Sequence, residues 1–599
     1  MKLFHKSLYI LGIAAALSSC DVLDQTSPSA YEPSSVYSNH GLARSAIDGI
    51  YEAYVTTTAY RSDYMMYYGA NTDIEFWVSN GDDERSAMCK YRILPNNSYL
   101  NRADATYFYA AVFNSIERAN VAIENLKKYG DVENRADMRN LLGEAITARA
   151  LLYADALNFY GEVPARFQPV TVETMYIPKS DRDVIYKQLL NDLAEAAQMM
   201  DFDAQTTITR PGKACALGLY ARLALQAAGY ALRPEEGKVN TGDLGKIRKS
   251  SDPELQKEVT YPIALAGLQE IINSKKFQLF ENFEDLWHYY CNLKTSIDAS
   301  GSEIIYGLPF GDNRGHHIVN NGVPNGKYDC GSSTGRKGVV PTFYFKYPSF
   351  DTRRDVTCCQ IRWDDNGDVE ESSLKSEYCY FGKFRFDWME TKPLATKDGE
   401  DGAKYTYLRY ADVLLMAAEI ANELGQLADA KNFMKPVLQR AYKNETEVSI
   451  YLSNLTTKDE FFQAIKDQRA FEFCGEMLRK QDLIRWNCLK SNIDDAIQDM
   501  KDLRALTGAW EGYRDAIYWR YKDSKDHMKV EVKFVKDTQE EPATSEGWKK
   551  KDKYLSTFSQ KTINNFYLED PDQNMYRPIP SSIITASLGT LKNDYGYTE

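Results

Sequence analysis

Small residues recur at helical spacing in several long stretches of the chain, and this pattern constrains the fold more than any other feature. Residues 141–160 place Ala145, Ala148 and Leu152 on one face, and residues 211–230 repeat the arrangement. Residues three and four apart share one face of a helix, and small side chains on that face let two helices approach closely. The sequence therefore predicts closely packed helices.

Further helices are predicted in stretches that often follow one another directly. They cover residues 43–54, 107–128, 183–200, 408–424 and 427–442. Consecutive helices of roughly 15–20 residues that face each other with small side chains are typical of tetratricopeptide-type repeats. The expected fold is mostly α, with a scaffold of tetratricopeptide-like helical pairs.

Residues 468–486 carry charges of alternating sign every three or four positions. The charged residues are Arg469, Glu472, Glu476, Arg479, Asp482 and Arg485. On one helix this spacing would place opposite charges side by side along a single stripe. An active-site cluster is one interpretation, but alternating signs at helical spacing favour an ion-pair ladder in the scaffold.

Residues 278–400 and 504–574 show no helical period and are rich in glycine, asparagine, aspartate and aromatic residues. Stretches of this length are too long to be plain connections in a compact domain. We expect them to form a loop-rich layer on the helical scaffold. Because loops held by a rigid scaffold often carry function, a binding site is expected in this layer.

The N-terminus has the form of an export signal. Lys2 and Lys6 precede a short apolar run over residues 8–17, and the small residues Ser18 and Ser19 precede Cys20. This ending resembles the bacterial lipobox, which implies cleavage before Cys20 and a diacylglycerol on its thiol; an ordinary signal with an incidental Cys20 is the alternative. No later segment reaches 18 apolar residues, so no other membrane span is expected.

The composition argues against several functions. A net charge of −13 without a basic run disfavours nucleic-acid binding. With six histidines and no Cys-x-x-Cys pair, we expect no metal site and no cofactor. Five of the ten cysteines lie between residues 291 and 379, which is compatible with one disulfide in an exported protein, although the sequence leaves its formation open.

Several motifs in this order resemble the SusD/RagB family of outer-membrane lipoproteins. Residues 482–486 read Asp-Leu-Ile-Arg-Trp, as at the end of a charged helix of that family, although Gln468 and Met477 depart from its pattern and are expected to weaken one turn of the ladder. The other matching segments are residues 143–150, 159–164, 191–196, 210–223, 341–354, 408–425, 577–580 and 594–597.

This resemblance implies about four helical pairs that support a large loop-rich ligand-binding face. It divides the chain into a signal peptide (1–19), a lipid-anchored tether (20–40), an N-terminal part (41–280) with a ligand loop at 61–100, and a C-terminal part (281–599) with helices at 408–490. It also implies a binding protein without catalysis, which lies at the cell exterior on the outer membrane. Such a protein captures a glycan and passes it to a SusC-like TonB-dependent transporter.

A glycan site needs flat apolar rings for the faces of sugars and polar groups for their hydroxyls. The family takes its ligand residues from the N-terminal loop and from loops roughly two hundred residues later. Loop-core packing is the alternative role for the aromatic candidates, and a bracing ion pair is the alternative for the charged ones. The candidates are Asp73, Trp77, Arg85, Trp287, Tyr289 and Tyr344.

Other functions stay open at this point. A peptide in place of a glycan suits the same aromatic loops. A surface glycosidase or a purely structural surface protein is a further hypothesis, and the sequence does not name the glycan.

Overall fold

The computed structural model describes residues 31–56, 59–61, 71–78, 81–101, 107–298, 301–311, 314–326, 333–390 and 400–597. The predicted signal peptide, Cys20 and the first part of the predicted tether lie outside these residues. So do residues 62–70 and 79–80 of the predicted ligand loop.

The end of the predicted tether is helical. Helices α2 (Pro33–Ser38) and α3 (His40–Asp48) occupy it, so the helical part begins before the expected residue 41. Pro33 lies in the first turn of α2, where its missing N–H has no helical partner to lose. The side chain of Asn39 accepts a hydrogen bond from Leu42 N at 3.1 Å and caps α3.

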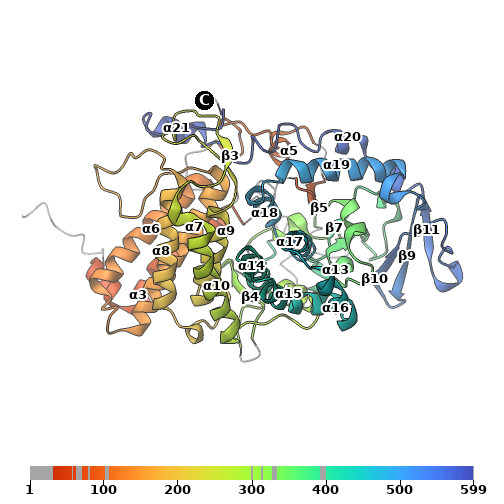
Figure 1. The fold of residues 1–599 in the computed structure, drawn as a ribbon, viewed down its shortest axis with the longest axis horizontal. Coiled ribbons are helices and arrows are strands. Elements are labelled where there is room, and N and C mark those ends of the chain that lie inside the picture. Colours follow the sequence, from red (N-terminus) through yellow and green to blue (C-terminus); the bar gives the residue numbers. More distant parts are fainter. Residues whose placement is uncertain are drawn as a thin grey trace, which may run out of the picture.

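The long helices of the N-terminal part each pack against the next one in the chain (Figure 1). Helix α7 is buried on most of its surface because it lies between α6 and α8, and small residues such as Ala145 and Ala148 allow that close packing. The prediction of a mostly α fold with paired helices is confirmed. These helices are α6 (Phe108–Tyr129), α7 (Ala136–Tyr160), α8 (Arg182–Met199), α9 (Lys213–Ala227) and α10 (Lys257–Ser274).

The C-terminal part contains a second group of helices. Helices α14 (Tyr410–Glu423) and α15 (Leu427–Tyr442) form the predicted hairpin, and Gly425 turns the chain with a φ of +78°. Helix α14 packs against α15 and α17 and also against α10, which joins the two groups. The helices that follow are α16 (Glu445–Asn454), α17 (Lys458–Phe473), α18 (Arg479–Arg485) and α19 (Leu489–Ala505).

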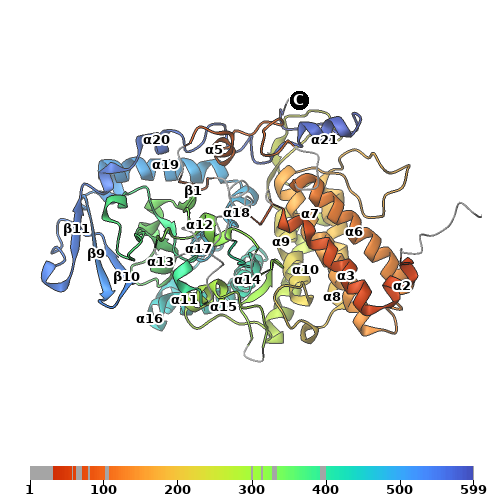
Figure 2. The same cartoon turned by 180° about the vertical axis from the view of Figure 1, so that it is seen from behind.

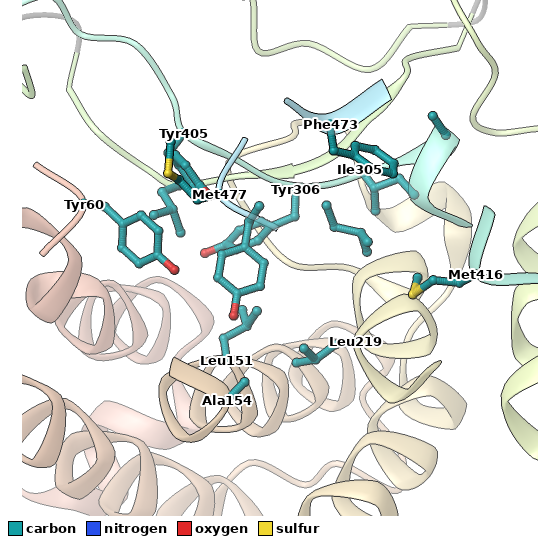
Figure 3. Packing of buried hydrophobic residues seen from close by; sticks show 14 of the residues in the cluster. Tyr60, Leu151, Ala154, Leu219, Ile305, Tyr306, Tyr405, Met416, Phe473 and Met477 are labelled. Atoms are coloured by element: carbon teal, nitrogen blue, oxygen red, sulfur yellow. The ribbon is translucent and has the colours of Figure 1, made fainter. Parts of the chain in front are cut away.

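One hydrophobic core runs through both groups of helices. Figure 3 shows Leu151 on α7 and Leu219 on α9 near Tyr306 and Met416, which come from the C-terminal part. The expected boundary near residue 280 therefore divides two parts of one packed core.

The loop-rich layer contains short antiparallel sheets and short helices (Figure 2). The order in the largest sheet is β1-β5-β7-β6, with Phe76 opposite Gly338. Its strands are β1 (Glu75–Trp77), β5 (Lys337–Val339), β6 (Cys358–Cys359) and β7 (Tyr380–Phe381); two further pairs are β2 (Ala231–Arg233) with β3 (Lys246–Arg248) and β4 (Ile304–Gly307) with β8 (Thr406–Arg409). The short helices are α5 (Glu84–Cys89), α11 (Phe283–Cys291), α12 (His317–Asn321), α13 (Arg353–Thr357), α20 (Gln560–Asn564) and α21 (Ser581–Ala586).

Part of the stretch predicted as loops, residues 504–574, forms a three-stranded sheet at one end of the molecule (Figure 1). Strand β9 (Ala516–Asp523) lies between β10 (Asp526–Lys533) and β11 (Lys549–Asp552). The prediction of loops was wrong for these residues. The many charged residues of β10 and β11 obscure the alternation of apolar and polar side chains by which a strand is recognised.

Residues 468–486 do not form one helical stripe. Helix α17 ends at Phe473, the backbone then turns through Gly475 (φ +90°) and Met477 (φ +61°), and α18 begins at Arg479. Half of the six charged residues, Glu472, Glu476 and Arg479, therefore pair only with other elements. The other three still pair with one another, as Asp482 lies 2.7 Å from both Arg469 and Arg485. Gln468 still has a cationic partner, since Arg353 Nη2 donates to Gln468 Oε1 at 2.7 Å; the expected weakening of this turn stays a prediction.

No disulfide joins two cysteines of the described part of the chain. Among the described residues, no helix combines the length and apolar character needed to cross a bilayer.

Candidate functional site

A groove of about 770 Å³ lies between α11, the segment 352–388 and the β9–β10 hairpin. In Figure 2, α11, α13 and β10 lie near one another, toward the end of the molecule that carries the three-stranded sheet. The volume falls in the range of small-molecule and oligosaccharide sites. The side chains that matter below are Glu284, His288, Tyr344, Asp355, Trp363, Arg385, Asp387, Trp388, Lys522, Asp526, Lys529 and Glu531.

Aromatic rings form one wall of this groove. The half-buried Trp388 stacks on His288 of α11, with ring centroids 4.3 Å apart and planes at 29°. The guanidinium carbon of Arg385 lies 4.6 Å from the ring centroid of Trp363 and 5.1 Å from that of Trp388. Trp363 is 2% exposed, whereas the flat ring of Trp388 is partly exposed and can pack against the apolar face of a sugar.

Arg385 is fixed in place by two partners. Its Nη2 lies 2.7 Å from Asp387 Oδ2 and donates to the carbonyl of Met528 on β10 at 3.1 Å. Burial alone would lower the pKa of Arg385, but the Asp387 carboxylate outweighs it, so the pKa is raised. The groove therefore holds a permanently charged donor beside the aromatic wall.

Carboxylates surround the rest of the opening. Glu284 lies on the first turn of α11, 3.6 Å from His288 Nε2. The polar contact with His288 is the main reason that the pKa of Glu284 is lowered, so this side chain is an ionised acceptor at neutral pH. Ionised carboxylates only accept hydrogen bonds, which suits the hydroxyl groups of a sugar.

The predicted tryptophans are buried. Trp77 on β1 is 5% exposed and donates from Nε1 to Ser86 Oγ at 3.1 Å. Trp287 on α11 is 1% exposed and packs edge-on against Phe283 and Phe384. Both occupy the packing role that the sequence analysis gave as the alternative, and their role in ligand binding stays a prediction.

The other predicted residues are scattered. Asp73 forms an ion pair with Arg479, with 2.6 Å between Oδ2 and Nη2. The guanidinium of Arg85 lies 4.6 Å above the Tyr99 ring, and the hydroxyl of Tyr289 donates to the Ser296 carbonyl at 2.9 Å. Of the six predicted residues, Tyr344 lines the groove, and Trp287 and Tyr289 flank His288 on α11.

Sequence reasoning missed Arg385, Asp387, Trp388 and Trp363. Residues 385–388 mix aromatic and charged side chains, which is the signal that selected residues 73–85. The sequence contains many such mixtures, and the packing of distant segments decides which of them face an open groove.

A smaller cavity of about 40 Å³ lies at the contact between the two groups of helices. It is lined by the buried carboxylate of Asp155 together with Arg222, Gln226, Gln481 and Arg485. A space of this size is too small for a sugar ring, so the larger groove is the candidate ligand site.

A Gly-x-Ser-x-Gly spacing at residues 331–335 raises the question of a nucleophilic serine. The hydroxyl of Ser333 is buried and donates to the carbonyls of Ile318 and Gly322 at 2.8 and 2.5 Å. This geometry fits a structural serine, because a nucleophile must be exposed to its substrate.

Two family models match separate parts of the chain. The family described as "SusD family" matches residues 360–597, and that described as "Starch-binding associating with outer membrane" matches residues 21–225. SusD-like protein P25 of Formosa agariphila is 22% identical over 84% of this chain and 92% of its own length.

Solved structures share the fold. A SusD homolog from Bacteroides thetaiotaomicron superposes with a TM-score of 0.69 at 18% identity, over 94% of this chain and 98% of that one. Surface glycan-binding protein A from the same organism, solved with laminarihexaose, gives a TM-score of 0.57 at 16% identity, over 92% and 99% of the two chains. Two family matches, a relative aligned over most of its length and the shared fold agree, and the chain belongs to the SusD/RagB family.

Proposed function

We propose that the protein is a cell-surface glycan-binding protein that captures its ligand in the groove beside Trp388. The observation that carries this proposal is the combination of an aromatic wall, a fixed guanidinium and ionised carboxylates in one groove of about 770 Å³. The complex of surface glycan-binding protein A with laminarihexaose supports it, because that protein shares the fold.

Binding would use two kinds of contact. The exposed part of Trp388 would pack on a sugar face at little entropic cost, because stacking on His288 already restrains the ring. Arg385 would donate to sugar oxygens, while Glu284 and neighbouring carboxylates would accept from hydroxyls. No bond is broken in this scheme, so the protein binds its ligand without turnover.

The second part of the proposal concerns delivery of the bound glycan to a transporter. A lipid on Cys20 would hold the protein on the outer membrane, and a SusC-like TonB-dependent transporter would receive the glycan. The match to a family described as associating with the outer membrane supports the location. Purification of the tagged protein from native membranes would bring down a large barrel partner; its repeated absence would contradict the transporter role.

The binding test uses a panel of soluble polysaccharides and oligopeptides, measured by calorimetry. We expect saturable binding to at least one glycan and no release of shorter products. The Trp388→Ala variant should lose tenfold or more in affinity with an unchanged unfolding curve, because interface aromatics in pockets dominate binding. Phe350→Ala is the matched control, since Phe350 is 42% exposed and does not line the groove.

Three results would change the proposal. If the protein bound a peptide and no glycan, the ligand class would be peptides instead of glycans. Hydrolysis of a bound oligosaccharide would indicate a glycosidase. An unchanged affinity in the Trp388→Ala variant would remove the groove from the binding site.

A further inference from the structure

The cavity of about 40 Å³ at the contact between the two groups of helices is lined by buried polar side chains. Three of their atoms make no hydrogen bond within the described part of the chain, namely Asp155 Oδ2, Gln226 Oε1 and Gln481 Nε2. Asp155 is 1% exposed and Gln226 is 8% exposed, so these two groups are shielded from bulk solvent. A buried polar group without a hydrogen bond is costly, and in native proteins such groups are paired with protein atoms or with ordered water.

We propose that this cavity is an internal hydration site that holds ordered water molecules. One water molecule needs about 10–15 Å³ of space, so the cavity has room for about three. Its lining residues differ from those of the groove, and its occupation does not depend on a glycan. The inference therefore goes beyond the proposed function.

Water meets the hydrogen-bonding needs of all three atoms. Gln226 Oε1 only accepts and Gln481 Nε2 only donates, and water molecules can donate to the first and accept from the second. Asp155 Oδ1 already accepts from the hydroxyls of Tyr60 and Tyr407 at 3.0 Å, which leaves Oδ2 to the cavity. Burial raises the pKa of Asp155 to about 7, so near neutral pH Oδ2 is found both as a donor and as an acceptor, and a water molecule that rotates serves both forms.

An ion fits this cavity less well than water does. The guanidinium groups of Arg222, Arg469 and Arg485 line it and repel a cation. Arg222 is paired with Asp412 at 2.6 Å. Arg469 and Arg485 both lie 2.7 Å from Asp482. An anion therefore meets guanidinium groups that carboxylates already neutralise, whereas water is neutral and both donates and accepts.

The water molecules connect the two groups of helices. Asp155 lies on α7 and Gln226 on α9 of the first group, whereas Gln481 lies on α18 of the second. Tyr405 and Met477, which also line the cavity, lie next to each other in Figure 3. A bridging water is nearly as favourable as a direct hydrogen bond, so hydration satisfies these side chains across the contact without direct pairing between them.

A crystal structure of the protein at a resolution that shows solvent tests the site. We expect about three ordered water molecules in the cavity, with Asp155 Oδ2, Gln226 Oε1 and Gln481 Nε2 each about 2.7–3.2 Å from one of them. Crystals pressurised with xenon should show no xenon there, because xenon enters cavities that are apolar and dry. A cavity without solvent peaks, a xenon peak, or a peak with the contacts of a metal ion or an anion would overturn the inference.

A matched pair of variants tests whether the polar side chains hold the water. Gln226→Met keeps the length of the side chain and removes its hydrogen-bonding groups, so at least one water molecule should be lost. Gln463→Met makes the same change at an exposed position of α17 outside the cavity and should leave every water molecule in place. Gln481→Met repeats the test from α18 if Gln226→Met does not fold. An unchanged set of water molecules in the cavity variant would overturn the inference.

Discussion

Two of the clusters of arginines and carboxylates in this molecule differ in how far water reaches them. One is the buried network around Glu472, where side chains are at most 5% exposed. The other is the groove around Arg385. The network contains the cations of Arg353, Lys383, Arg409 and Arg440 and the anions of Glu303, Asp351, Glu472 and Glu476, so its net charge is zero.

The network is neutral because a buried charge without a partner is very costly. Glu472 receives Arg409 Nη1 at 2.7 Å and Arg353 Nη1 at 3.1 Å, and it also pairs with Arg440. Burial alone would raise the pKa of Glu472, but the three guanidinium groups outweigh it, so the pKa is lowered. In the groove, water reaches the charged side chains, so an ion pair there contributes little to stability. The burial of the paired charges therefore distinguishes the scaffold network from the groove.

The largest effect is expected from breaking the network. Glu472→Gln removes the charge that three arginines share, and loss of one partner from a buried ion pair costs about 3–5 kcal/mol. We expect a loss of about 5 kcal/mol in the free energy of unfolding, or failure to fold, as measured by urea denaturation and soluble yield. The control is Glu445→Gln, which breaks an exposed pair with Lys435 at 2.6 Å and should leave the free energy of unfolding nearly unchanged, because water screens that pair. Similar losses of unfolding free energy in both variants would contradict the distinction between the buried network and exposed ion pairs.

Trp287 lies where the scaffold meets the groove. It precedes the groove residue His288 on α11, but its own side chain packs in the core. Trp287→Ala should reduce the free energy of unfolding by about 3–4 kcal/mol, since it empties a large buried volume. Urea denaturation measures the loss. If the stability stays unchanged while glycan affinity falls, Trp287 contacts the ligand as the sequence analysis predicts.

The helical pairs could be predicted from the sequence because helical periodicity is a local property. Helical spacing also allowed the charges of residues 468–486 to be predicted as part of the scaffold. It did not allow their ion-pair partners to be predicted. Arg353, Arg409 and Arg440 come from segments far away in the chain, and Gly475 breaks the helix that was expected to align the charges.

The groove could not be predicted, because its walls come from residues as far apart as Glu284 and Val532. Trp287 and Trp388 both lie in aromatic, charged segments of the loop-rich layer. One is buried and the other lines the groove. Only the packing of α11 against the later segments distinguishes them, and composition carries no signal of that packing.

The carboxylate of Asp155 is buried and accepts hydrogen bonds from hydroxyl groups, and its pKa is raised. Tyr60 and Tyr407 donate to its Oδ1 at 3.0 Å, and burial raises its pKa from 3.8 to about 7. In the unfolded chain the group ionises near its ordinary pKa, so folding at intermediate pH binds a proton. Its stabilising contribution is therefore complete below about pH 4 and is lost as the pH rises toward 7, at about 1.4 kcal/mol per pH unit.

The corresponding variant is Asp155→Asn, which keeps the shape and removes the titration. We expect the wild type to lose roughly 2–3 kcal/mol relative to this variant between about pH 5 and pH 7. Urea unfolding of both proteins across this range measures the difference. Parallel pH profiles would show that Asp155 ionises normally in the folded protein.

The smallest effect on stability is expected when Glu284, a glutamate of the groove, is changed to glutamine, as proposed above for Glu472. Glu284 is about half exposed, and its contacts are a pair with His288 and the dipole of α11. Glu284→Gln should therefore cost only about 0.5 kcal/mol of stability. The amide still accepts a hydrogen bond but more weakly than the carboxylate, so affinity for a neutral glycan should fall about twofold to tenfold. A large loss of stability with unchanged affinity would show that the groove carboxylates belong to the scaffold, and the distinction between the two clusters would fail.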